Sequence, residues 1–169
     1  METYIIGDPH FGHVNIIEYE KRPFQSVEDM DNKLISNWNK TVSKKDKIIV
    51  NGDVSFYEKV KTAEIIKSLN GYKILVMGNH DDGRTIKFWY DAGFSFVSKY
   101  PIVYDNFLFI SHEPPSYIPI GTPYFYFYAH VHSSEMYQTI TKTSACTSVE
   151  RWNYTPLNIN HALDLSRIK

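Results

Sequence analysis

Three short apolar runs in the first half of the chain each end in residues that can bind a metal ion, and this pattern restricts the fold most. The runs are Thr3–Gly7, Lys47–Val50 and Lys73–Met77. The polar residues after them are Asp8 with His10, then Asp53, then Asn79 with His80. Helical patterns separate the runs, and this alternation predicts parallel strands joined by helical crossovers. The carboxyl ends of such strands meet at one edge of a sheet, where ligand sites gather.

The helical patterns carry ordinary start and stop signals. Ser26 is the expected N-cap of the first helix, and Glu58–Leu69 and Gly83–Ala92 predict two more. Beyond these helices, strand-like runs follow at short spacing, which predicts an antiparallel meander with a tight turn at Asp105-Asn106. The runs are Phe94–Val97, Ile102–Tyr104, Phe107–Ser111, Tyr124–Ala129, Glu135–Ile140 and Ala145–Val149.

Size and composition exclude several other classes of protein. The 169 residues are enough for one domain, which we place over residues 1–169. Lys and Arg number 18 and Asp and Glu 19, so no large basic field is present to hold nucleic acid non-specifically. The single cysteine excludes a disulfide framework. No apolar run approaches the roughly 20 residues that span a bilayer, and no signal peptide is visible, so we expect a cytoplasmic protein without a membrane partner.

Later runs also end in histidine, which places candidate ligands from five segments at one edge. These residues are His112, His130 and His132, and six of the seven histidines lie in or beside such clusters. Carboxylate, imidazole and amide donors without a thiolate suit Mn, Fe, Zn, Co or Ni. The ligands are too many for one ion, so we expect two divalent ions that share a bridging carboxylate, with manganese favoured.

The ordered set of motifs resembles the calcineurin-like metallophosphoesterase superfamily, in particular its small bacterial and phage-type members. The motifs are Asp8-x-His10, Gly52-Asp53, Gly78-Asn79-His80-Asp81, His112 and His130-x-His132. The Val149–Pro156 stretch also looks like the closing segment of small bacterial members. The resemblance implies an α/β fold, a four-layer α-β-β-α sandwich of two mixed sheets flanked by helices.

The resemblance also implies roles for the motif residues. The implied metal ligands are Asp8, His10 and His132 for the first ion, Asn79, His112 and His130 for the second, and Asp53 as the bridge. His80 would face the substrate as a catalytic residue, and Asp81 would orient it through a hydrogen bond. The structural alternative for His80 is a further ligand or a loop cap. Ala129 stands where the family usually has glycine, which leaves the turn before His130 in question.

Other residues have two interpretations each. His13, Arg22 and Arg84 are candidate substrate contacts. A helix start explains His13 equally well, and a solvated surface position is the more frequent explanation for the two arginines. The aromatic run Tyr124–Tyr128 predicts a buried strand rather than a stacking platform. The Pro114–Pro123 loop is a candidate lid beside the site.

The sequence therefore predicts a metal-dependent phosphohydrolase in which a hydroxide bridging two ions attacks phosphorus and His80 assists the leaving oxygen. A small phosphorylated substrate is expected, with a phosphodiester favoured and nucleic acid possible only as substrate. The alternatives are a phosphomonoesterase or phosphoprotein phosphatase, and a non-catalytic metal-binding scaffold of the same fold that binds protein partners. The motifs do not determine the native substrate or the oligomeric state.

Overall fold

The computed structural model describes residues 1–168 and places the three parallel runs at the centre of the first of two sheets. Its strands are β1 (Thr3–Ile6), β2 (Lys47–Asn51), β3 (Tyr72–Val76), β4 (Phe96–Ser98) and β9 (Leu157–Asn158). They run in the order β4-β3-β2-β1-β9, with β9 antiparallel to β1 and the other pairs parallel. The central strands are buried on both faces, which explains why they read as continuous apolar runs.

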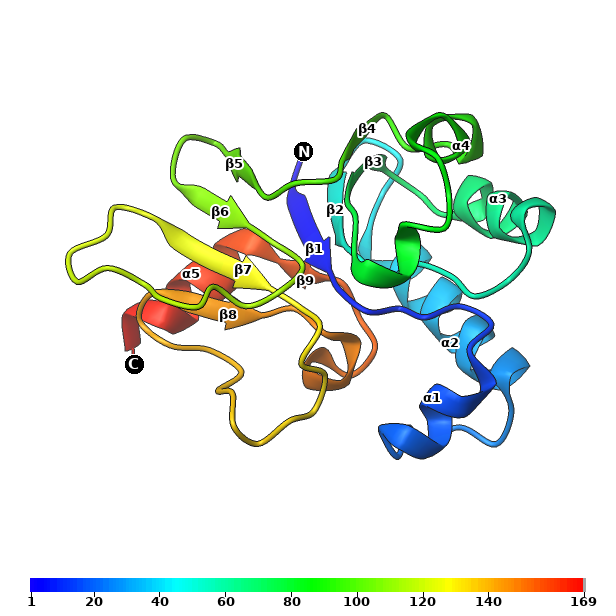
Figure 1. Ribbon diagram of the computed structural model, residues 1–169, viewed down its shortest axis with the longest axis horizontal. Helices are drawn as coiled ribbons and strands as arrows, with labels where there is room; N and C mark the ends of the chain where they lie inside the picture. Colours follow the sequence, from blue (N-terminus) through cyan, green and yellow to red (C-terminus); the bar gives the residue numbers. More distant parts are fainter. Residues whose placement is uncertain (169) are drawn as a thin grey trace.

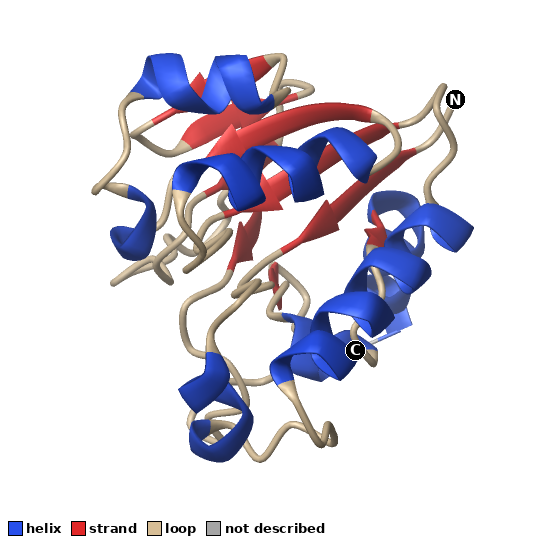
Figure 2. Ribbon diagram, turned by 90° about the vertical axis from the view of Figure 1, so that its right-hand side faces the viewer, coloured by secondary structure: helices blue, strands red, loops and turns tan. Residues whose placement is uncertain are grey.

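Helices connect these strands, and all but the first of them lie across the outer face of the first sheet (Figure 2). They are α1 (Val14–Tyr19), α2 (Val27–Thr41), α3 (Lys59–Ser68) and α4 (Ile86–Ala92). The Ser26 side chain accepts the N–H of Asp29 and caps α2, as the sequence predicted. No helix within residues 1–168 has the length and apolar character needed to cross a membrane.

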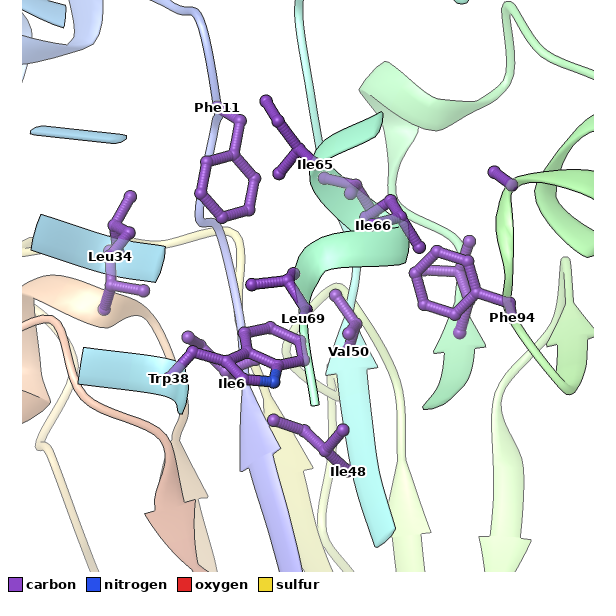
Figure 3. Packing of buried hydrophobic residues seen from close by; sticks show 14 of the residues in the cluster. Ile6, Phe11, Leu34, Trp38, Ile48, Val50, Ile65, Ile66, Leu69 and Phe94 are labelled. Carbon is purple, nitrogen blue, oxygen red and sulfur yellow. The ribbon is translucent and has the colours of Figure 1, made fainter. Parts of the chain in front are cut away.

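The first hydrophobic core fills the space between these helices and the first sheet (Figure 3). Trp38 of α2 lies over Ile6 and Ile48, while Ile66 of α3 packs nearby. All four side chains are buried. Burial of each aliphatic side chain contributes on the order of 1.5–3 kcal/mol, so this core fixes the sheet edge from which the polar residues project.

The second sheet contains β5 (Ile102–Tyr104), β6 (Leu108–Ile110), β7 (Phe125–Tyr128) and β8 (Ser144–Cys146), in that order. It lies beside the first sheet with α5 (Ile159–Ile168) alongside (Figure 1). The two sheets pack through a second core that includes Ile5, Ile49, Ile110 and Phe127. The expected α/β fold of two mixed sheets with flanking helices is confirmed.

The strand directions in the second sheet correct one sequence prediction. Only β5 and β6 form an antiparallel hairpin, and its turn residues Asp105 and Asn106 have φ of 50° and 65°. The pairs β6–β7 and β7–β8 are parallel. A long irregular connection joins the strands of each pair. A parallel pair requires it, because the chain has to return to the end of the sheet where the previous strand began.

The strand predicted over Glu135–Ile140 is absent, and within it only Ile140 pairs as in a sheet, through an isolated antiparallel bridge to Ala145. Arg151 explains the difference, because its guanidinium donates to the carbonyl oxygens of His132, Ser134 and Tyr137 at 2.6, 2.7 and 3.0 Å. This side chain therefore satisfies carbonyl groups along residues 132–137 that a strand would pair with a neighbour, while the Thr139 carbonyl accepts the N–H of Cys146 in β8 at 3.0 Å. Arg151 belongs to a short 3₁₀ turn, η2 (Val149–Trp152).

Candidate metal centre

Two clusters of potential metal ligands form where the carboxyl ends of the two sheets meet. The arrowheads of β1 and β7 point toward this shared region in Figure 1. The first group is Asp8, His10 and His132, and the second group is Asp53, His112 and His130. Within each group the ligand atoms lie within 4.8 Å of one another. The structure thus brings together residues that are up to 124 positions apart, from Asp8 to His132 (132 − 8).

Most of these residues have an unusual backbone conformation. Five of the six have a left-handed φ: Asp8 at 54°, His10 at 53°, Asp53 at 56°, His130 at 69° and His132 at 44°. Non-glycine residues rarely adopt such φ values, and each costs on the order of 1–3 kcal/mol. Strain of this kind, concentrated in one set of polar residues, indicates a site for which the fold is specifically shaped.

Asp53 lies between the two groups. Its Oδ2 is 3.5 Å from His10 Nε2 and 3.4 Å from His112 Nε2, while its Oδ1 accepts the backbone N–H of His80 at 3.0 Å. The side chain of Asp53 is almost completely buried. A carboxylate oxygen between two clusters of nitrogen donors is placed to contact two cations at once, as the sequence expectation for Asp53 requires.

Two buried ligand atoms have no hydrogen-bond partner among the described residues. They are Asp8 Oδ1 and His10 Nε2, both within the first group. The other carboxylate oxygen of Asp8 accepts from the backbone N–H of His130 and from the Ser148 hydroxyl. Buried polar atoms without partners are costly, and a cation at this point would satisfy both.

The pKa shifts of the groups in the centre favour positive charge between its carboxylates. Burial alone would lower the pKa of His112, but the carboxylates of Asp53 and Asp8 outweigh it and raise the pKa to about 9. Burial alone would raise the pKa of Asp53, but the imidazoles of His10 and His112 hold it well below its ordinary value. The carboxylates around His112 would therefore stabilise a cation held by this group.

The imidazole rings are oriented through their Nδ1 atoms. His112 Nδ1 donates to the Asn51 carbonyl at 2.9 Å, which directs Nε2 toward Asp53 and the Asn79 amide oxygen, 3.2 Å away. His10 Nδ1 lies 3.1 Å from His13 Nδ1. Outer hydrogen bonds of this kind fix which nitrogen of a histidine faces a metal ion. Asn79, which the motif predicted as a ligand, thus lies beside the second group.

Arg22 and Glu150 support the first group from behind. Arg22 is buried, and it donates to the carbonyl oxygens of Asp8 and Pro9 at 2.9 and 3.0 Å. It also donates to Glu150 Oε1 at 2.6 Å, and the same oxygen lies 3.0 Å from His132 Nδ1. One arginine therefore braces the backbone that carries Asp8 and, through Glu150, the ring of His132. Arg22 holds the centre in place instead of facing substrate.

Glu150 is a residue that sequence reasoning missed. It lies on η2, inside the Val149–Pro156 stretch whose resemblance to the family was the only signal available. Burial alone would raise its pKa, but His132 and Arg22 lower the pKa to about 2. Glu150 is thus a carboxylate that stays ionised beside the first group.

Asp81 has a different role from the one expected. Its two carboxylate oxygens accept the backbone N–H groups of Gly78, Asp53 and Val54 at 2.9, 2.8 and 3.0 Å. Burial raises the pKa of Asp81 to about 6, and these N–H groups limit the rise. Asp81 therefore ties the loop after β2 to the loop after β3, and these contacts do not orient His80.

His80 lies at the mouth of the centre among other rings. Its side chain is 48% exposed, and its Nε2 is 4.0 Å from Asp53 Oδ2. The Phe56 ring contacts two of them, and its centroid lies 4.9 Å from that of His80 and 3.9 Å from that of His13. His13, Phe56 and His80 form the aromatic rim, as we call this set below. The rim borders the first group through His10, whose ring centroid is 5.7 Å from that of His80.

The third basic candidate, Arg84, is also engaged in the fold. Its guanidinium donates to the carbonyl oxygens of Ser55 and Tyr57. Its guanidinium carbon lies 5.4 Å from the Trp89 ring centroid. Arg84 thus fastens the loop after β2 to α4, and the structure does not bring it to the ligand groups.

Glycines allow the close approach of the loops in the second group. A Cβ on Gly52, where φ is 84°, would lie 2.1 Å from His112 Nδ1. A Cβ on Gly78 would lie 2.2 Å from Asp53 Oδ1. Any side chain at either position would displace a ligand, which explains the glycines in the Gly52-Asp53 and Gly78-Asn79 motifs.

Ala129, the departure from the family pattern, fits because of its neighbour. A Cβ on Gly7 would lie only 2.6 Å from the Ala129 Cβ, so the alanine methyl occupies the space left by Gly7. Ala129 is fully buried, and its N–H donates to the His112 carbonyl at 2.8 Å. The turn before His130 is therefore intact with alanine.

A pocket of about 470 Å³ borders the second group at Asn79 and His112. Its other walls come from the ends of β3 and β4 and from the segment after β6. The centre thus has the aromatic rim beside its first group and an open pocket beside its second.

Comparisons with known proteins agree with this arrangement. The sequence model for the calcineurin-like phosphoesterase family matches residues 1–160. The uncharacterized protein MJ1445 of Methanocaldococcus jannaschii is 33% identical over 167 residues, which cover 94% of this chain and 88% of the relative. Among solved structures, a protein of unknown function from Aquifex aeolicus, AQ665, has a TM-score of 0.70 and 24% identity, with 97% and 98% of the two chains covered.

A second solved structure, the Pseudomonas putida nuclease MPE, has a TM-score of 0.49 and 20% identity, with 77% of this chain and 60% of the nuclease covered. The match over residues 1–160 and the archaeal relative above 30% identity are sufficient for assignment. This chain belongs to the calcineurin-like phosphoesterase family.

Proposed function

We propose that the protein is a phosphodiesterase that uses two divalent metal ions. The observation that carries the proposal is the pair of buried, unpartnered atoms, Asp8 Oδ1 and His10 Nε2, beside a carboxylate that lies between two histidine groups. The donor set of carboxylates, imidazoles and one amide suits manganese, which we propose as the working metal. Such ions supply an activated water and neutralise charge on phosphoryl oxygens.

The chain's own residues have separate tasks in this proposal. Asp53 and the other residues of the two groups would hold the ions, and His80 acts on the substrate. His80 is suited to this task because its side chain is half exposed and belongs to neither ligand group. It donates a proton to the oxygen of the departing alcohol as that oxygen gains negative charge.

A pocket and an aromatic surface beside the centre favour a diester over a monoester. A diester places two organic groups on either side of its phosphorus, whereas a monoester has one. The pocket at Asn79 and His112 can hold one group, and the aromatic rim can contact the other. A monoester has no second organic group for the aromatic rim to contact.

The test is an activity panel on protein stripped of metal and then loaded separately with Mn, Fe, Co, Ni, Zn or Mg. Bis(p-nitrophenyl) phosphate, p-nitrophenyl phosphate and a cyclic nucleotide represent the substrate classes. We expect manganese to support the fastest hydrolysis and the diesters to exceed the monoester in kcat/KM. A preference for the monoester would overturn the diester assignment, and no hydrolysis with any metal would overturn the enzyme assignment.

A further inference from the structure

The pocket beside the second group has a chemistry of its own, and we propose that it selects one ester group of the substrate. This inference rests on the proposed function. The pocket holds a planar aromatic group of nucleoside size, which stacks on Tyr100. The pocket volume of about 470 Å³ lies within the ~300–1,000 Å³ typical of small-molecule sites. A methyl or ethyl ester would leave most of this space filled with water.

The walls of the pocket are flat and stiff. Tyr100 and Pro101 form one side, and Pro114 and Pro115 belong to the segment after β6 that forms another. Tyr100 is 76% exposed, so a ligand can cover its ring without displacing a packed neighbour. An exposed aromatic ring in a pocket with proline walls offers a stacking surface that costs little conformational entropy.

Two serines hold these walls in position without a ligand. Ser98 Oγ donates to the Tyr100 carbonyl and accepts the Tyr100 N–H, at 2.8 and 3.1 Å. Ser111 Oγ donates to the Glu113 carbonyl at 2.7 Å, just before the prolines. Both segments are therefore anchored at their bases, which indicates a pocket formed in advance.

The charges at the pocket favour a neutral ring over a chain of phosphates. Apart from His112, which belongs to the second group, the charged residues that line it are Lys99, Asp82 and Glu113, one cation and two carboxylates. Lys99 Nζ lies 3.8 Å from Asp82 Oδ1, so its charge is already partly balanced. A polynucleotide backbone requires a surplus of positive charge. A nucleobase instead offers ring nitrogens and oxygens to these polar groups while its face stacks on Tyr100.

Direct binding of adenosine, with ribose for comparison, tests the proposal on the metal-free protein by NMR titration. Adenosine should bind and ribose should not. Tyr100→Ala should weaken adenosine binding roughly 5- to 100-fold, since stacking of one base contributes about that factor. Tyr100→Phe should bind as the natural chain does, because the ring face is retained. Tyr72→Ala, which removes a half-exposed tyrosine at the opposite end of β3, is the matched control.

Each outcome decides between the proposals. If adenosine does not bind, or binds Tyr100→Ala as tightly as the natural chain, the aromatic pocket is wrong. Hydrolysis of bis(p-nitrophenyl) phosphate by the same protein after it has been loaded with metal tests the proposed function separately. A protein that hydrolyses diesters without binding adenosine overturns the pocket alone, and one that binds adenosine through Tyr100 but hydrolyses nothing overturns the function alone.

Discussion

The two groups of the metal centre are supported by different parts of the protein. Side chains brace the first group, where Arg22 and Glu150 form a buried ion pair behind His132. Backbone braces the second, where the Asn51 carbonyl orients His112 and Gly52 allows its close approach. The first group borders the aromatic rim, whereas the second opens on a pocket. We infer that the first group retains its ion while the second meets the substrate.

The largest effect should come from Asp53→Asn, because Asp53 contacts both groups. Loss of its negative charge removes the shared ligand, so metal content should fall from about two ions per chain to less than one. Elemental analysis after dialysis measures this, with Asp8→Asn as the comparison that should mainly empty the first group. Retention of two ions by Asp53→Asn would show that the groups are independent.

His80→Ala should separate catalysis from metal binding. Both groups should keep their ions, while kcat falls about 10²- to 10⁴-fold, the usual contribution of a general acid. The loss should be larger for an alkyl leaving group than for nitrophenolate, which needs less protonation. Equal losses for both would assign His80 to the phosphoryl oxygens, and a lower metal content would make it a ligand.

Glu150→Gln should weaken the first group selectively. The change keeps the shape but removes the charge that pairs with Arg22 and faces His132. Loss of an outer partner of a metal ligand typically costs 10- to 100-fold in affinity. Calorimetric titration with manganese should show one weakened step and one unchanged step. Glu18→Gln, on the exposed surface of α1, is the matched control and should leave both steps intact. Equal weakening of both steps would contradict separate support.

Ala129→Gly should have the smallest effect, because this residue precedes ligands of both groups without touching an ion. Removing the buried methyl should lower the free energy of unfolding by about 1–2 kcal/mol, from lost burial and gained backbone freedom. Denaturant unfolding measures the change, and metal content should stay at two ions. Gly7→Ala, which adds a methyl to the same space, should destabilise more. A lower metal content in Ala129→Gly would mean that the methyl itself shapes the turn.

The shared location of the candidate ligands could be predicted because each lies within a few residues of the end of an apolar run. Strand ends are local features, so Asp8, Asp53 and His112 could be assigned to one edge before any contact was known. The helix cap at Ser26 and the turn at Asp105 were predictable for the same reason, because the signal lies within a few residues.

The supporting residues could not be predicted, because their partners lie far away in the sequence. Arg22 and Glu150 are 128 residues apart, and no spacing rule connects them. Arg151 similarly removes a strand by donating to carbonyls 14 to 19 residues away. Asp81 follows His80 directly, yet its oxygens reach backbone around Asp53. Adjacency in sequence suggested a contact that the short 3₁₀ turn η1 (Asn79–Asp81) does not make.

The long sequence separation between Arg22 and Glu150 also bears on when, during synthesis, the first group can be completed. Asp8 and His10 leave the ribosome early, but His132 and Glu150 follow more than a hundred residues later. At roughly 5–20 residues per second the interval is on the order of 10 s. During that time the nascent chain displays two ligands without the rest of their coordination sphere. We therefore expect the first group to be complete only once Glu150 has been synthesised, so that an ion bound there would be one available to the nearly finished chain.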